Sequence, residues 1–549
     1  SQPFTYDNCK KCTIVYNGEI YNYVELKDEL IKKGYTFRTS SDTEVLAALY
    51  LDKGNELLNY IDGMFAFAIW DYQENKIFCA RDRFGEKPFY YSINKNYFVF
   101  ASEIKSIFAS GIKKEINLNR LCHYLAFNQI ENSNSISETF YNDVYSLEPA
   151  HYLEIKLDGN ITKKNYWDIT CNVRQSINIE SASEELKNLL CNSIKLRLRS
   201  DVNIGSSLSG GLDSSIIVKV IDDLVKGATS QKTFSARYQN FERDEGFFID
   251  RVSSEISSRS YSIWPTAIDF VREFDNIFYH QEEPFESTSI FAQWQVMKLA
   301  KEQNTVVILD GQGADELFAG YHGYFYPYIL GLYKTDSKSA MTELAEYNKL
   351  HKKNISIGKL LQLKIKFPIL IDRLDKLKNK QNSIRKLNIS GLSSEFVNAY
   401  LKSDNLHDPV FHDLNSALLY SIQKKGLTRL LRYSDRNSMA HSREVRLPFL
   451  DHKIAEFCFS LPERLKIKMG WTKYVLRKTY EKSLPDEIIW RKDKTGFVTP
   501  ENKWFKDPLF IEMFRDSSDK LKRMNFIKEI VPGMEWRYLM ANSVIEFIK

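Results

Sequence analysis

Short apolar runs separated by turn residues fill the chain from Thr13 to about Ser110. Runs of this length predict strands, whereas one stretch near residues 23–33 has apolar positions at helical spacing and ends at Gly34. A strand-rich segment with one helix and no regular strand–helix alternation favours an α+β sandwich. The strand-like runs are residues 13–16, 66–70, 77–80 and 97–101, and the helical positions are Val24, Leu26, Leu30 and Ile31.

A different pattern begins after a polar, irregular stretch at residues 167–184, which we interpret as a linker. Beyond it, each short apolar strand is followed by a polar loop and a helix, which indicates a doubly wound parallel sheet that binds ligands at the carboxyl ends of its strands. Residues 324–425 have helical periodicity and Lys-rich faces, and we interpret them as helical elaboration. The strands are expected at residues 201–208, 233–238 and 305–309, and the two units at residues 1–166 and 185–549.

The composition is typical of a globular protein, with 43% hydrophobic and 27% charged residues among 549. The net charge of +5 is a small difference between 76 basic and 71 acidic residues, so it does not indicate a nucleic-acid partner. No run approaches the roughly 18 apolar residues of a membrane span, and no secretory signal is evident. Seven cysteines without regular spacing favour reduced thiols. We therefore expect a cytoplasmic protein with no membrane partner.

The run SGGLDSS at residues 209–215 lies between a predicted strand and a predicted helix, where it is suited to bind phosphate. Its two glycines let the backbone approach the ligand, the helix N-terminus offers unpaired N–H groups, and the serines add donors. Asp213 alone would repel phosphate, so a hard cation such as Mg²⁺ is expected between them. A plain connecting turn is the alternative, but the whole heptad resembles the pyrophosphate-binding loop of the N-type ATP pyrophosphatases.

A second glycine-containing run, DGQGADE at residues 310–316, follows the apolar strand at residues 305–309. Its glycines again allow close approach of backbone to ligand, and Asp315 offers a second carboxylate to the same Mg²⁺. A connecting loop capped by an acid is the alternative interpretation.

These runs together resemble the asparagine synthetase family of glutamine-dependent amidotransferases, and the resemblance extends over nearly the whole chain. It implies an Ntn-hydrolase-like glutaminase sandwich followed by an ATP pyrophosphatase domain. It also implies that ATP with Mg²⁺ adenylates a carboxylate and that ammonia from glutamine then forms the amide. The further matching runs are NGEIYN at residues 17–22, SDTE at 41–44, GMFAFAIW at 63–70, ARDRFGEKP at 80–88 and EVRLPFLD at 444–451.

The same resemblance assigns residues to the ATP site, with Asp213 and Asp315 as metal ligands. Arg436, Arg446 and Lys494 match basic residues of that site, where cations would stabilise the charge on the departing pyrophosphate. Taken one at a time, each is better explained as an ordinary surface cation, but the motif context favours Lys494 and Arg446 as site residues. The residues expected to bind ATP are Leu208, Ser209, Gly210, Gly211, Asp213, Ser214, Ser215, Ala236, Gly311 and Arg436.

Members of the family begin with a cysteine that attacks the glutamine amide, and neither Cys9 nor Cys12 matches it. Because residues 2–3 and 17–18 resemble stretches well inside that domain, we expect several tens of upstream residues to be missing. A chain unable to hydrolyse glutamine is the alternative.

Other parts of the glutamine site are retained by resemblance. Asn17 and Gly18 resemble the oxyanion-hole donors, and Glu19 and Asp42 resemble the residues that hold the ammonium group of glutamine. From the residues alone, a turn at 17–19 and a helix cap at Asp42 fit as well.

Gln312 departs from the family pattern, because well-known asparagine synthetases have a glutamate there. A carboxylate can take a proton from the attacking ammonia, whereas a primary amide cannot. The proton would then pass to Glu444 or to the departing AMP, or the acceptor would not be aspartate. We expect aspartate, with a sugar uronate or a secondary metabolite as the close alternative and a nucleotide-binding regulatory relative as the distant one. The sequence leaves open whether the chain forms a homodimer.

Overall fold

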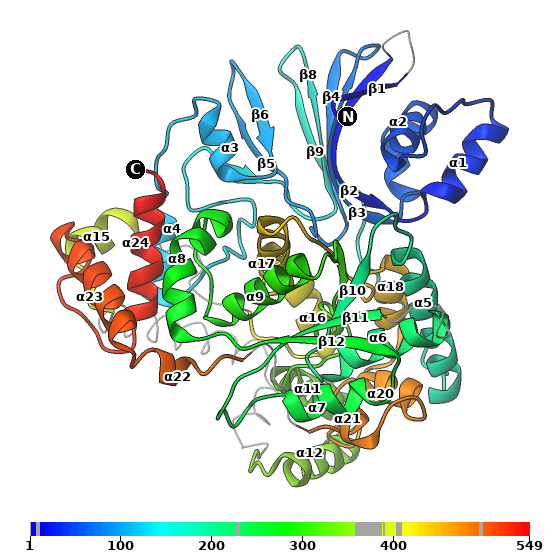
Figure 1. The fold of residues 1–549 in the computed structure, drawn as a ribbon, viewed down its shortest axis with the longest axis vertical. Coiled ribbons are helices and arrows are strands. Elements are labelled where there is room, and N and C mark those ends of the chain that lie inside the picture. Colours follow the sequence, from blue (N-terminus) through cyan, green and yellow to red (C-terminus); the bar gives the residue numbers. More distant parts are fainter. Residues whose placement is uncertain are drawn as a thin grey trace.

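Two antiparallel sheets form the first part of the chain (Figure 1). The computed structural model describes residues 2–6, 11–225, 231–356, 387, 390–401, 409–492 and 498–549. The six-stranded sheet has the order β1-β2-β3-β4-β8-β9 and the three-stranded sheet the order β6-β5-β7. The strands are β1 Phe4–Tyr6, β2 Cys12–Ile20, β3 Gly63–Asp71, β4 Lys76–Arg81, β5 Tyr90–Ile93, β6 Phe98–Ala101, β7 Tyr145–Ser146, β8 His151–Lys156 and β9 Ile161–Asn165.

Helices cover one face of the larger sheet, and the smaller sheet covers its other face. Leu26 and Leu30 of one helix pack with Phe67 and Phe78 of the larger sheet, while alanines on the opposite face of that sheet pack with Tyr91 of the smaller one. This layering confirms the predicted α+β sandwich. The helices of this part are α1 Tyr23–Lys32, α2 Asp42–Lys53, η1 Gly54–Asn59, α3 Ile104–Ala109 and α4 Leu118–Phe127.

The prediction of a single helix among these strands was wrong, because α2 also lies there. All seven residues from Glu44 to Tyr50 are buried, so apolar side chains occupy nearly every side of this helix. A helix that is apolar all round has no 3.6-residue alternation for a sequence pattern to detect.

The second part of the chain is built on a parallel five-stranded sheet with the order β12-β11-β10-β13-β14. This confirms the predicted parallel sheet. From β10 the chain adds β11 and β12 on one side and then β13 and β14 on the other, so the strand order reverses between β10 and β13. The carboxyl ends of these two strands therefore flank the position at which such sheets bind ligands. The strands are β10 Ile204–Ser207, β11 Gln231–Ala236, β12 Ser258–Ile263, β13 Val307–Leu309 and β14 Glu444–Arg446.

Helices pack on the sheet and extend beyond it. Figure 1 shows α9 and α17 on the side of the sheet nearer the first part of the chain. The helices are α5 Ile179–Arg197, α6 Leu212–Val225, α7 Gly246–Ser253, α8 Ala267–Gln281, α9 Ser289–Glu302, α10 Ala314–Leu317, η2 His322–Tyr324, α11 Phe325–Thr335, α12 Ser337–His351, α15 Ser394–Tyr400, α16 Leu414–Gln423, α17 Leu427–Ala440, α18 His452–Ser460, α19 Glu463–Lys466, α20 Tyr474–Tyr480, α21 Asp486–Ile489, α22 Glu501–Trp504, α23 Pro508–Arg523 and α24 Glu535–Phe547.

The stretch expected to be a linker is packed against the second part of the chain. Ile169 is buried in the core that contains α5 and α6, and Trp167 lies against the same core. Helix α5 already begins at Ile179, inside the predicted range.

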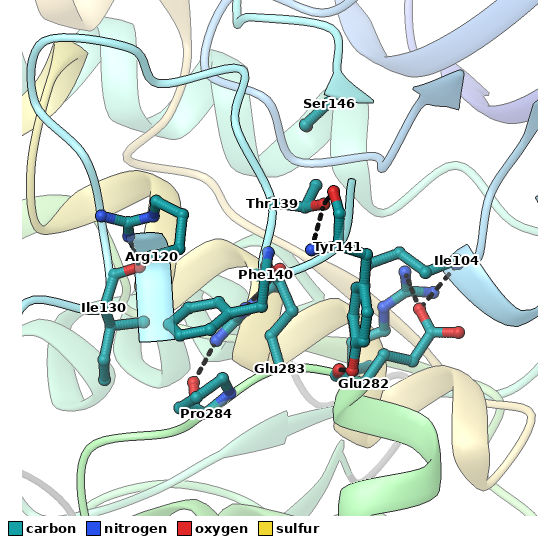
Figure 2. A network of polar contacts seen from close by, with 12 residues as sticks. Ile104, Arg120, Ile130, Thr139, Phe140, Tyr141, Ser146, Glu282, Glu283 and Pro284 are labelled. Atoms are coloured by element: carbon teal, nitrogen blue, oxygen red, sulfur yellow. Dashed lines mark hydrogen bonds and ion pairs between the residues drawn. The ribbon is translucent and has the colours of Figure 1, made fainter. Parts of the chain in front are cut away.

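Buried carboxylates join the two parts of the chain. Glu282, at the end of α8, accepts from the Ile104 N–H at 2.9 Å, and Glu283 accepts from the Phe140 N–H at 3.1 Å (Figure 2). Two arginines of α17 neutralise these acids: Arg436 pairs with Glu282 at 3.0 Å, and Arg432 pairs with Glu283 at 2.6 Å. Each buried charge is therefore both paired and hydrogen-bonded, which the low dielectric of an interior requires.

Among the helices in the described ranges, none combines the length and the apolar character needed to cross a bilayer.

Candidate functional site

Two glycine-containing loops meet where the strand order reverses. Residues 209–215 follow β10, and residues 310–316 follow the neighbouring β13. A Cβ added to Gly311 would lie 2.9 Å from the Asp213 Cβ and 3.1 Å from the Ser214 nitrogen. Only glycine fits this close approach, so the sequence of one loop is adapted to contact the other.

The first loop is held by its own hydroxyl groups and leads directly into helix α6. The Ser215 Oγ donates to the Gly211 carbonyl at 2.7 Å, and the hydroxyls of Ser209 and Ser214 lie 3.2 Å apart. Helix α6 begins at Leu212, inside the 209–215 loop. Its first N–H groups and its positive dipole end are therefore within the loop, which favours an anion there.

A buried lysine bridges the two acids predicted to bind metal. The Nζ of Lys473 lies 2.5 Å and 2.6 Å from the two Asp213 oxygens and 2.7 Å from an Asp315 oxygen. Burial lowers the pKa of Lys473, while Asp213 opposes that shift. The two carboxylates thus converge on one cation, the ammonium group of Lys473.

More cations line the cavity of about 320 Å³ between the loops. Arg477, one helical turn after Lys473, has its pKa lowered to about 10 by burial. Arg491 donates to the Gly210 carbonyl at 3.3 Å and pairs with Glu245 at 2.8 Å. These cations are suited to hold the phosphates of a nucleotide or a departing pyrophosphate.

Half of the residues predicted to bind ATP line this cavity, and most of the others are close to these in the chain. Leu208 precedes it, donating its N–H to the Phe234 carbonyl at 2.9 Å, and Ala236 ends the adjacent strand β11. Gly210 and Ser215 complete the loop. The predicted residues that line the cavity are Ser209, Gly211, Asp213, Ser214, Gly311, Gln312 and Asp315.

Two of the predicted basic residues, Arg446 and Arg436, lie elsewhere. Arg446 ends β14, where it pairs with Glu444 at 2.6 Å and with Glu19 of the first part of the chain at 3.3 Å. Arg436 pairs with Glu282 on α8. Lys494 lies outside the described residues. Of the predicted basic residues that the structure describes, neither Arg436 nor Arg446 lines the cavity between the loops.

Sequence reasoning missed Lys473 and Arg477. The only signal was two cations four residues apart, a spacing that places them on one face of a helix but is also common on exposed surfaces. Their burial could not be read from the sequence.

Gln312 contributes a neutral amide to the cavity. Its Oε1 atom is buried and has no hydrogen-bond partner among the described residues. An unpaired buried acceptor costs free energy until a donor reaches it. The position is therefore suited to a ligand that donates a hydrogen bond.

The residues predicted for the glutamine site cluster at the end of β2. Gly18 has φ +146°, and a Cβ there would lie 2.0 Å from the Met64 carbonyl oxygen. The Asn17 amide donates to the Ser102 hydroxyl at 3.3 Å. Asp42 accepts from the Tyr16 hydroxyl at 2.8 Å and from the Ile20 N–H at 3.1 Å, so it fixes the backbone around Glu19.

Glu19 lies in an environment that disfavours its charge. Burial and then the neighbouring Glu444 raise the pKa of Glu19 to about 7, and Arg446 offsets this only in part. Cys12 is no candidate nucleophile, since burial raises the pKa of its thiol to about 12. A neutral buried thiol is a poor nucleophile.

Comparisons with known proteins agree with this geometry. The model of the asparagine synthase family matches residues 185–529, and that of the glutamine amidotransferase domain matches residues 1–167. Asparagine synthetase (glutamine-hydrolyzing) 1 of Bacillus subtilis is 31% identical, over 92% of this chain and 79% of that protein. Asparagine synthetase (glutamine-hydrolyzing) 3 of the same organism is 28% identical, over 87% and 74%. Amidase chry2 of Gibberella zeae is 26% identical, over 93% and 80%.

Proposed function

The chain belongs to the asparagine synthase family of glutamine-dependent amidotransferases, and we propose on that premise that it adenylates a carboxylate with ATP and converts it to an amide. The observation that carries this proposal is the contact of two glycine-containing loops beside Lys473, Asp213 and Asp315. Both carboxylates and cations line the cavity there, and a helix N-terminus lies on one side of it. This combination suits a polyphosphate and its counter-ion.

In the proposed reaction an oxygen of the acceptor carboxylate attacks the α-phosphorus of ATP. The bond from the α-phosphorus to the bridging oxygen breaks, and pyrophosphate leaves with that electron pair. Arg477 and Arg491 stabilise its negative charge, and the 209–215 loop orients it through N–H and hydroxyl donors. Ammonia then attacks the acyl carbon and AMP leaves. The new nitrogen loses a proton, which passes to a nearby base. Glu444, or the departing AMP, remains the predicted acceptor of that proton.

The residues present fit a magnesium ion. Asp213 and Asp315 offer hard oxygen ligands that already share one cation, the Lys473 ammonium. When bound, such an ion would neutralise phosphate charge. Lys473, in turn, holds the two carboxylates close together and offsets their repulsion.

Glutamine is the proposed source of ammonia, through the amidotransferase domain. Asn17 and Gly18 are proposed to stabilise the oxyanion, and Glu19 and Asp42 to hold the ammonium group of glutamine. Free ammonia replaces this half-reaction in the test below, so the test concerns the ATP site alone.

Aspartate is the acceptor implied by the names of the relatives, and it is the first one to test. Gln312 supports a second acceptor class, because its amide stands where a glutamate is usual in asparagine synthetases. A sugar uronate is that second candidate.

The proposal is tested by incubating the protein with ATP, MgCl₂, ammonium chloride and a panel of carboxylates, followed by nucleotide chromatography. We expect AMP and pyrophosphate in equal amounts, and ADP as the product would refute the assignment. Asp213→Asn should lower the rate by roughly 10²-fold or more, since it removes a charge at the phosphate site. The control is Asp223→Asn on the same helix, where the side chain is 58% exposed and outside the cavity. It should leave the rate unchanged.

A further inference from the structure

A second and larger cavity opens beside the nucleotide cavity along the same edge of the parallel sheet. Its volume is about 1380 Å³, and it is bordered by residues 238–243 after β11 and 264–268 after β12. Pockets for ordinary small ligands occupy roughly 300–1,000 Å³. This groove is therefore large enough for an extended ligand, whereas a free amino acid would fill a small fraction of it.

The groove and the nucleotide cavity lie at the ends of neighbouring strands of the sheet. Strand β11 pairs with β10, so the carboxyl ends of these strands lie about 4.8 Å apart. Arg491, which lines the nucleotide cavity, pairs at 2.8 Å with Glu245, two residues beyond the groove residue Arg243. A ligand in the groove can thus extend a carboxylate toward the 209–215 loop.

Aromatic side chains give the groove an apolar surface. Trp264 is 48% exposed, which is unusual for so large an apolar side chain, and Ile268 beside it is 44% exposed. Tyr238 packs edge-on against Phe241 and Trp504, with ring centroids 5.9 Å and 6.0 Å away. An aromatic face of this kind binds flat, partly apolar rings.

The charged residues of the lining balance one another. Arg243, Lys503 and Lys506 are matched by Glu242, Glu501 and Asp507. Such a lining favours neither a polyanion nor a polycation, and it also lacks the excess of one charge expected of a nucleic-acid site.

Neutral hydrogen-bonding groups fill the space between these charges. Amide side chains come from Gln239, Asn240 and Asn502, and hydroxyls from Ser287 and Ser289. Amides and hydroxyls both donate and accept, as the hydroxyls of a ligand do.

Tyr238 provides an independent indication of a ligand. The side chain is more than nine-tenths buried, it lines the groove, and its hydroxyl has no hydrogen-bond partner among the described residues. A buried tyrosine hydroxyl normally finds a partner, so a ligand hydroxyl is the natural one here.

We propose that this groove binds the sugar rings of a carbohydrate acceptor, and that the carboxylate amidated at the nucleotide site belongs to a uronic acid. The inference rests on the proposed function for its chemistry. A pyranose ring has an apolar C–H face that matches Trp264 and a hydroxyl rim that matches the amides. The orphan amide oxygen of Gln312 accepts from a sugar hydroxyl in the same way.

Saccharide binding is tested by calorimetry with tri-galacturonate, without ATP. We expect binding to the wild-type protein and about tenfold weaker binding to Trp264→Ala, because the variant removes the aromatic face. Tyr326→Ala, which removes a 45% exposed aromatic side chain on α11, should bind as the wild type does. Equal affinity of wild type and Trp264→Ala, or no binding to either, overturns the proposal, and so does tighter binding of an aspartate-containing tripeptide.

Turnover is tested by AMP formation with tri-galacturonate, glucuronate, galacturonate and aspartate, with ATP, MgCl₂ and ammonium chloride present. We expect kcat/KM to be higher for a uronate than for aspartate. Trp264→Ala should raise KM for tri-galacturonate and leave KM for ATP unchanged. Aspartate as the best acceptor overturns the proposal. If no carboxylate yields AMP, the proposed function fails, whereas the calorimetry still decides whether the groove binds saccharide.

Discussion

The ionisation of buried side chains at the candidate sites depends on their immediate neighbours. Lys473 stays among carboxylates although burial opposes its charge, and Glu19 lies close to two other acids, Asp42 and Glu444. Glu19 belongs to the first part of the chain and Arg446 to the second, so their ion pair at 3.3 Å joins the two parts.

The raised pKa of Glu19 has a consequence for stability. Its pKa rises from 4.5 to about 7 on folding, so between these values the folded state holds the proton more tightly than the unfolded state. Stability contributed by this group is present below pH 4.5 and is lost as the pH rises toward 7. The melting temperature of Glu19→Gln should therefore rise relative to that of the wild type as the pH rises from 4.5 to 7. A difference that stays constant or falls over this range would contradict the argument, and the exposed Glu29→Gln on α1 is the control.

At the scale of an element, the contact between the 209–215 and 310–316 loops depends on Gly311, which has no side chain. A Cβ on Gly311 would lie 2.9 Å from the Asp213 Cβ, which is closer than Cβ atoms pack, and 3.1 Å from the Ser214 nitrogen. Strands β10 and β13 bring the two loops together, and the glycine lets them touch.

Gly311→Ala should separate these loops without unfolding the sheet. The added Cβ would lie 2.9 Å from the Asp213 Cβ, so Asp213 must move away from Lys473. We expect AMP formation to fall by roughly 10²-fold. Gly323→Ala is the matched control, since a Cβ there meets nothing within 4 Å. Assays of both variants, with melting temperatures, check the result; similar activity in the two would show that the loop contact is dispensable.

At the scale of the whole molecule, buried ion pairs hold the two parts of the chain together. Lys87 of the first part pairs with Asp435 of α17 at 3.1 Å, and the side chains are only 4% and 7% exposed. The network of Glu282 and Glu283 lies in the same region of contact (Figure 2). Because these charges are desolvated, each depends on its partner.

Lys87→Met should destabilise the protein by about 3–5 kcal/mol, because Asp435 is left buried without its partner. Urea unfolding measures this loss. The double variant Lys87→Met/Asp435→Leu should recover part of it, since no uncompensated charge remains. The pair Lys76–Glu154, at 2.8 Å and with side chains 18% and 19% exposed, is the control. Lys76→Met should cost no more than about 1 kcal/mol. A small loss for Lys87→Met would contradict the dependence of Asp435 on its partner.

The sequence by itself determined the two fold classes and the positions of the two glycine-containing loops. Strand runs, the glycines of both loops and the acids Asp213 and Asp315 are local features, and their chemistry follows from spacing along the chain. The structure brought these loop residues to one cavity because adjacent parallel strands end at the same edge.

Only the tertiary structure decided which other side chains reach that cavity. Lys473 comes from a segment 260 residues after Asp213, and no local pattern distinguishes it from a surface lysine. Arg446, matched by its motif to the ATP site, instead pairs with Glu19, because strand β14 is the far edge of the sheet and its end faces the first part of the chain. Burial and long-range pairing depend on how distant segments pack. No single stretch of the sequence therefore contains that information.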